Sequence, residues 1–269
     1  MKHACILAII ATLSPIPVTA HEFWLEPEKY QVLSGESIRA DLRNGQKFEG
    51  VSLPYNENSF LAFERAFAGE VTAVKGRLGD RPGLQTTLPA EGLASYAYTS
   101  TLAHVNYTSW EKFQAFVDHK DFGDVQARHS ARGLDPEKFK EAYTRFAKTL
   151  VGVGNAAGQD RAFGMETELV ALANPYTDIT DGTLQVQALY QSQPRPDVQI
   201  ELFEKAPDDS VSITLHRTND AGVATLPVKA GHSYIVDAVV LRVPSAEVAD
   251  KQGAVWETLW ASLTFSVPQ

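Results

Sequence analysis

Hydrophobic and polar residues alternate in short runs along most of the chain, a pattern that predicts half-buried β-strands. The segment YQVLSGESIRADLRNG alternates and is punctuated by Gly35 and by the pair Asn44–Gly45, which is typical of hairpin turns. The segment SYAYTSTLAHVNYTS is rich in β-branched and aromatic residues, as expected of a strand with one buried face. Residues 21 to about 109 are therefore predicted to be β-rich.

Between about residues 110 and 152 the spacing of apolar residues changes to three or four, which predicts two helices. In SWEKFQAFVDHKDFG, Ser109 is a candidate N-cap for the first helix. In LDPEKFKEAYTRFAKTLVG, Asp135 is the candidate N-cap, Pro136 occupies the first turn and Gly152 is a stop signal. We expect these two helices to interrupt the strands as one insertion.

After the glycine-rich stretch GVGNAAG, short strands and turns return at the spacing of an antiparallel sandwich. A soft boundary is expected near Asn174–Pro175, which leads into YTDITDG. The sequence thus predicts a mainly β protein with two antiparallel β-sandwich modules. The first would cover residues 21–174 and contain the helical insertion at about 110–152, and the second would cover residues 175–269.

The first 20 residues have the pattern of a secretory signal peptide, and cleavage is predicted just before His21. Lys2 is followed by an apolar run and then by small residues at the cleavage positions. The run is too short to span a membrane, and no later segment approaches the roughly 20 residues required. The chain's one cysteine, Cys5, lies in this leader. A cysteine-free exported chain suits a bacterial periplasm, with full secretion as the alternative.

The formal net charge of −9 argues against nucleic acid or an anionic membrane as a partner. It favours cations mildly, although the same charge would also serve only to keep the protein soluble. No P-loop, dinucleotide fingerprint or GxSxG motif is present, so the known enzyme motifs give no support for catalysis.

His21 is the strongest candidate for chemistry, because at a free N-terminus one residue would carry both an α-amine and an imidazole. These two nitrogens can chelate one metal ion in a six-membered ring, and they suit Cu(II), Ni(II), Co(II) and Zn(II). A second histidine would complete the three-nitrogen arrangement called a histidine brace. Five further histidines could supply that ring: His104, His119, His129, His216 and His232. Each of them alone is also consistent with an ordinary surface or structural histidine.

Five segments in order resemble one family: HEFWLEP after the cleavage site, RFAKTLV, ELVALANPY, TNDAGVATLPVKAG and WETLWASLTF. It is a family of exported domains of unknown function described as nickel-uptake-like, or as the periplasmic component of a cobalt/nickel ABC transport system. The resemblance implies an Ig-like or carboxypeptidase-regulatory-like module at the C-terminal end and a role in transition-metal handling. It also implies His104 and His129 as partners of His21, with His119 as a further candidate.

The expected function is therefore that of a periplasmic protein that binds nickel, cobalt or copper for uptake or delivery, without catalysis. An ABC-type or TonB-dependent uptake system would be its partner. Two alternatives remain open: a copper oxygenase built on the same histidine brace, and a β-sandwich binding module in which no metal takes part. The pair Trp256 and Trp260 bears on the oxygenase alternative. Two tryptophans four residues apart form either part of the core or a platform for a ligand such as a sugar.

We predict that the exported chain begins at His21. Intact-mass measurement and N-terminal sequencing of protein recovered from the periplasm should give a start at HEFWLEP. A start at any other residue would remove the free amine from the imidazole and would rule out the chelate.

Overall fold

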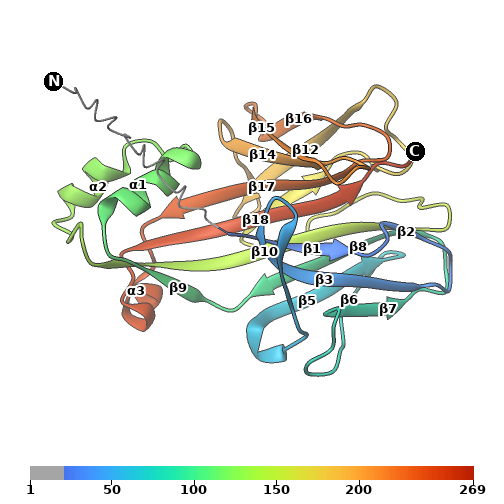
Figure 1. The fold of residues 1–269 in the computed structure, drawn as a ribbon, viewed down its shortest axis with the longest axis horizontal. Helices are drawn as coiled ribbons and strands as arrows, with labels where there is room; N and C mark the ends of the chain where they lie inside the picture. Colours follow the sequence, from blue (N-terminus) through green and yellow to red (C-terminus); the bar gives the residue numbers. More distant parts are fainter. Residues whose placement is uncertain (1–20) are drawn as a thin grey trace, which may run out of the picture.

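The structure is a computed structural model that describes residues 21–269, and it is built mainly from β-strands with a short helical insertion (Figure 1). The mainly β fold class with a helical insertion is thereby confirmed. Within residues 21–269 the strands form one long sheet and two smaller ones. No helix in this range is long and apolar enough to cross a membrane.

The long sheet has ten strands and runs through the middle of the molecule (Figure 1). Its main path runs, in spatial order, through β15 (Val211–Arg217), β14 (Gln199–Lys205), β17 (Ser233–Arg242), β18 (Trp256–Ser266), β10 (Phe139–Val153), β8 (Gly92–Ser100), β5 (Phe60–Phe67) and β6 (Glu70–Ala73). Two further strands, β2 (Gln31–Val32) and β9 (Ala103–Tyr107), also pair with β10.

Two four-stranded sheets cover this long sheet. The first consists of β1 (Glu22–Pro27), β3 (Ser37–Gln46), β4 (Glu49–Leu53) and β7 (Leu84–Thr87). The second consists of β11 (Thr167–Ala171), β12 (Thr183–Tyr190), β13 (Gln193–Pro194) and β16 (Val223–Pro227). Alternate side chains of β10 pack into two different cores. Ala147 and Val151 lie under the first small sheet, and Leu150 lies under the second. Because successive strand residues point to opposite faces, the two small sheets cover opposite faces of the long one.

The parallel pairing of β10 with β18 joins the two halves of the chain, and it runs from Glu141 opposite Trp256 to Thr149 opposite Thr264. Strand β1 is fastened across this pair by two side-chain hydrogen bonds. The Ser262 hydroxyl donates to the Phe23 carbonyl at 2.8 Å, and the Thr264 hydroxyl donates to the Leu25 carbonyl at 2.6 Å. These bonds fix where β1 starts, and therefore where His21 lies.

The predicted boundary near residue 175 does not separate two sheets. Strands β14, β17 and β18 come after residue 175, and β5, β8 and β10 come before it, yet all six belong to the ten-stranded sheet. The two predicted modules, residues 21–174 and 175–269, are thus joined by one continuous set of backbone hydrogen bonds.

The helical insertion contains α1 (Trp110–His119) and α2 (Val125–Ala131), which lie together at one end of the long sheet (Figure 1). The first helix is the one predicted after Ser109. A 3-10 turn, η1 (Glu57–Ser59), and the helix α3 (Ala246–Gln252) occur elsewhere.

The predicted second helix, from Asp135 to Gly152, is wrong, because these residues lead into and form β10. The Asp135 carboxylate does accept a hydrogen bond from the backbone N–H of Glu137 at 2.8 Å, as in a cap. No helix follows, because the chain extends into β10. Strand β10 is buried on both faces, so its apolar residues do not alternate with polar ones. Such a strand gives an apolar pattern that helix and strand share.

The core between β18 and the second small sheet should dominate stability. Leu263 is fully buried there, so Leu263→Ala should lower the free energy of unfolding by about 2–5 kcal/mol through lost contacts and a residual cavity. The matched change Leu61→Ala, at a residue of β5 that is 73% exposed, should cost much less. Urea unfolding followed by circular dichroism measures both, and equal losses would contradict this assignment of the core.

Candidate functional site

His21 is exposed at the first described position, immediately before β1, and it lies on the rim of a cavity of about 370 Å³. The walls come from five elements that are far apart in sequence, namely β3, β9, α1, β10 and β18. The cavity residues used below are Lys112, Phe116, Glu141, Tyr143, Arg145 and Trp260. One end of the long sheet and the helical insertion therefore meet at the residue that the sequence singled out.

An aromatic pair forms one part of the cavity wall. The Trp260 ring stacks on Phe116 with a centroid separation of 5.4 Å and an interplanar angle of 16°. The two tryptophans four residues apart both belong to one buried aromatic cluster beneath the helices, as the core interpretation of the pair predicts. Trp260 also lines the cavity.

Glu141 lines the cavity from β10 and is held by two hydroxyl groups. Tyr107 donates to one carboxylate oxygen at 2.9 Å, and Thr258 donates to the other. Burial raises the pKa of Glu141, although both hydroxyl contacts act in the opposite direction. The carboxyl group is therefore a fixed, satisfied part of the wall.

Directly behind His21 lies a buried ionic cluster, formed by Glu22, Lys120, Glu201 and Asp237. The Lys120 ammonium lies 2.6 Å from a Glu201 oxygen, 2.8 Å from an Asp237 oxygen and 3.7 Å from a Glu22 oxygen. All four side chains are at most 3% exposed. The cluster joins α1 to β1, β14 and β17, and it pins the residue that follows His21.

Burial and mutual attraction set the protonation of this cluster. Burial raises the pKa of Glu22 to about 7 and also raises that of Asp237. Burial acts to lower the pKa of Lys120, but the three carboxylates outweigh it and raise that pKa. Burial acts to raise the pKa of Glu201, but contacts with His119 and Lys120 hold it below its usual value. Glu22 is consequently the member that titrates near neutral pH.

His119 is the predicted histidine that the structure connects to the start of β1. Its Nε2 lies 2.8 Å from a Glu201 oxygen, and that contact raises the pKa of the half-exposed imidazole. Lys112, Phe116 and His119 follow one another at spacings of four and three residues, so they lie on one face of α1. His119 therefore shares a helix face with two residues of the cavity wall, and Glu22 acts on it electrostatically.

His129 and His104 are engaged elsewhere. His129 is buried beside Trp256, whose indole N–H donates to Nδ1 at 3.0 Å, while Nε2 lies 3.2 Å from the Asp135 carbonyl. With both ring nitrogens bonded, His129 does not fit a metal site. His104 lies on β9, and its Nδ1 contacts the Gln252 side chain of α3 at 2.9 Å. Within residues 21–269 no group of three or more His, Cys, Asp or Glu side chains is placed to hold a metal ion.

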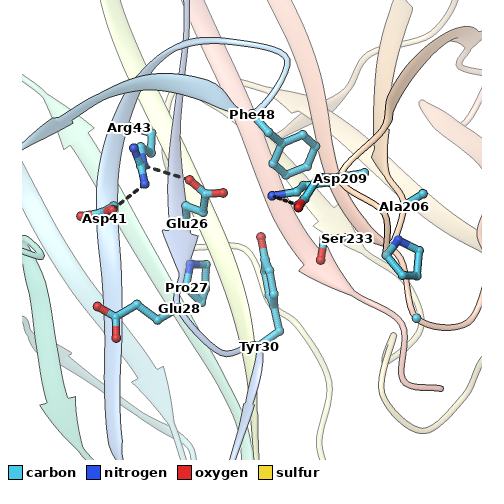
Figure 2. Close-up of a pocket in the computed structure, with 13 residues that line it drawn as sticks. Glu26, Pro27, Glu28, Tyr30, Asp41, Arg43, Phe48, Ala206, Asp209 and Ser233 are labelled. Atoms are coloured by element: carbon cyan, nitrogen blue, oxygen red, sulfur yellow. Dashed lines mark ion pairs between the residues drawn. The ribbon is translucent and has the colours of Figure 1, made fainter.

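A second cavity, of about 380 Å³, lies between the first small sheet and the turns at the ends of β14 and β17 (Figure 2). Its charges pair with each other. Arg43 lies 2.9 Å from both Glu26 and Asp41, and Lys205 lies 2.9 Å from Asp209. The acidic and basic groups of the cavity lining other than Glu28 are therefore engaged with one another.

The sequence reasoning did not identify Lys120, Glu201 or Asp237. A signal for two of them was present, because Glu201 and Asp237 interrupt the apolar segments VQIELF and YIVDAVV. A charged residue inside an apolar strand is rarely fully buried unless it is paired. Their common partner, Lys120, lies on a different element and could not be identified from spacing.

Comparison with known proteins places the chain in a family. The profile of a domain of unknown function, DUF4198, matches residues 18–242. The chain belongs to this family. The DUF4198 match includes His21 and all four members of the ionic cluster, and it agrees with the predicted resemblance to a family of unknown function. No functionally curated protein matches the chain.

Among solved structures, one described as the D0-D1 domain of intimin covers 91% of this DUF4198 chain and 98% of its own. Its sequence identity is 10% and its TM-score is 0.22. At these values the similarity carries no information about function.

The pKa of Glu22 gives a test of the cluster. Because its folded pKa of about 7 exceeds the value of 4.5 for a free carboxyl, its contribution to stability is present at low pH and is lost as the pH rises through 7. Glu22→Gln removes that loss, so the variant should gain on the order of 2 kcal/mol relative to wild type between about pH 5 and 8. Urea unfolding at several pH values measures the difference. Glu70→Gln, on an exposed strand, is the control, and parallel pH profiles for wild type and Glu22→Gln would contradict the assignment.

Proposed function

We propose that the mature protein binds a transition-metal ion, namely nickel, cobalt or copper, through His21, and that it carries this ion in a metal uptake or delivery system of the periplasm. The α-amine and the ring of His21 would supply two nitrogens, and the ring of His119 a third. The observation that carries the proposal is the position of His21, which is exposed on a cavity rim directly before a residue fixed in the ionic cluster.

Anchoring supports this role because a chelating terminus must not fray. Chain ends are ordinarily mobile unless they are tied down. Here Glu22 is buried against Lys120, and β1 is bonded across to β18 through Ser262 and Thr264. A metal ion bound at His21 would therefore meet a ring and an amine of limited freedom, which lowers the entropic cost of binding.

The surroundings of His119 support its part in the site. Metal-binding histidines commonly engage a carboxylate through the ring nitrogen that does not face the metal. The contact between His119 Nε2 and Glu201 has this form, and it leaves Nδ1 for the ion. His129 is excluded from the proposed ligand set, since both of its nitrogens are bonded in the core. His104 is excluded because its ring is directed to α3.

The physiological role follows from the resemblance of the sequence to nickel-uptake-like exported domains. Such a protein would take up the ion after export and pass it to an ABC-type or TonB-dependent partner. The proposed role includes no catalytic step.

Metal titration tests the proposal. Mature protein starting at His21 should bind Ni(II), Co(II) or Cu(II) with 1:1 stoichiometry in isothermal titration calorimetry. An extension of about ten glycine and serine residues before His21 converts the His21 amine to an amide and carries the new terminal amine away from the ring. It should weaken binding at least about tenfold, the lower bound for losing even an outer contact of a metal site. His119→Gln should weaken binding to a similar degree.

The matched control is His216→Gln, because His216 lies on the edge strand β15 and contacts only Thr214 among side chains within hydrogen-bond distance. This variant should bind the metal as wild type does. Equal affinity of the extended and mature chains would show that the terminal amine is not a ligand and would overturn the proposal.

A further inference from the structure

The cavity beside His21 is lined by more basic than acidic side chains. Arg145 projects from β10 into the cavity wall, and Lys112 joins it from α1, whereas the wall contains one carboxyl group, that of Glu141. The chain as a whole carries a net charge of −9. A cavity with more cations than carboxylates in so acidic a protein indicates local selection for negative charge in the occupant.

Arg145 is the unusual member of this group. Within residues 21–269 its guanidinium forms no ion pair, and its Nη1 is buried without a hydrogen-bond partner. The guanidinium instead lies over aromatic rings, 4.1 Å from the Trp260 centroid and 4.9 Å from that of Tyr143. An arginine stays charged in proteins, so leaving one of its guanidinium nitrogens buried without a partner is costly.

A second, partly buried arginine shows how the same fold satisfies this group. Arg242, on β17, contacts Glu257 and Glu166, and it also donates to the Tyr190 hydroxyl at 2.9 Å. Arg145 has no equivalent carboxylate, because Glu141 on the same strand is already bonded to Tyr107 and Thr258. Within residues 21–269 no carboxylate therefore lies at ion-pair distance from Arg145, although Asp237, Glu141 and Glu22 attract its charge from farther away.

We propose that this cavity binds a small organic carboxylate, whose carboxylate group pairs with Arg145 in the two-point geometry that guanidinium and carboxylate share. Lys112 adds charge at the cavity wall, and the rings of Tyr143, Phe116 and Trp260 contact the carbon skeleton. The volume of about 370 Å³ suits a molecule of a few carbon atoms and excludes a polymer chain from full enclosure.

The carboxylate site does not depend on the metal proposal, although His21 lies on the same rim. A molecule held at Arg145 has its far end toward solvent, because the cavity is open on one side. A second polar group on that molecule would then lie on the side of His21. The chemical class of the ligand is set by Arg145 alone and holds whether or not a metal is bound.

Calorimetric titration of the chain extended before His21 by glycine and serine residues, in which the terminal chelate is removed, tests this site separately from the metal site. Acetate, succinate and citrate are the probes, in a buffer without carboxylates and at fixed ionic strength. At least one of them should bind saturably, and succinamide, which has the skeleton of succinate without its charge, should bind at least about tenfold more weakly. Binding of none of the three acids would overturn the proposal.

Two substitutions complete the test. Arg145→Met keeps the bulk but removes the charge, and it should weaken binding of the acid at least about tenfold. Because it also removes a buried unpaired charge, the unliganded variant should unfold at an equal or higher temperature than wild type. Arg77→Met, on an exposed loop far from the cavity lining, is the control and should bind as wild type. Equal affinity of the wild-type and Arg145→Met chains would contradict the assignment.

Discussion

The parallel pairing of β10 and β18 is the constraint on which the rest of the structure depends. It places a segment from the middle of the chain beside a segment from its end. Alternate side chains of β10 supply both cores, and β18 supplies the core under the second small sheet. A slip of one residue would exchange the two faces of β10 and bring its buried polar residues into the wrong core. The same pairing places Arg145 directly opposite Trp260, so the cavity beside His21 is a product of this register.

The ionic cluster around Lys120 has a different role, because it joins the helical insertion to the sheet. Three carboxylates from three strands converge on one ammonium group of α1. Taking such groups out of water costs free energy that their attraction only partly offsets, so the cluster specifies position more than it adds stability. What it positions is the end of α1, with His119, and the start of β1, with His21.

The sequence predicted those features that depend on local pattern. Alternation and turn dipeptides indicated the strands, and Ser109 marked the first helix correctly. Strand β10 was misread as a helix because a strand buried on both faces loses its alternation, so that Phe139, Ala142 and Phe146 happen to fit a helical stripe. Of the residues in the proposed metal site, the sequence indicated His21 and, as a further candidate, His119. The engagement of His129 with Trp256, and the meeting of Lys120 with Glu201 and Asp237, are contacts between residues far apart in the chain, which spacing does not encode.

The order of strands in the long sheet has a consequence for the time course of folding. Strand β18 is the last of the chain's strands, yet it sits between β17 and β10 at the centre of the sheet. Until residues 256–266 have been synthesised, β10 lacks one neighbour and the two halves cannot close on each other. Topologies dominated by such distant pairings form slowly, because the entropy of loop closure is lost before the stabilising contacts form. A nascent chain of this design therefore stays open until its final segment can pair with β10 and β17.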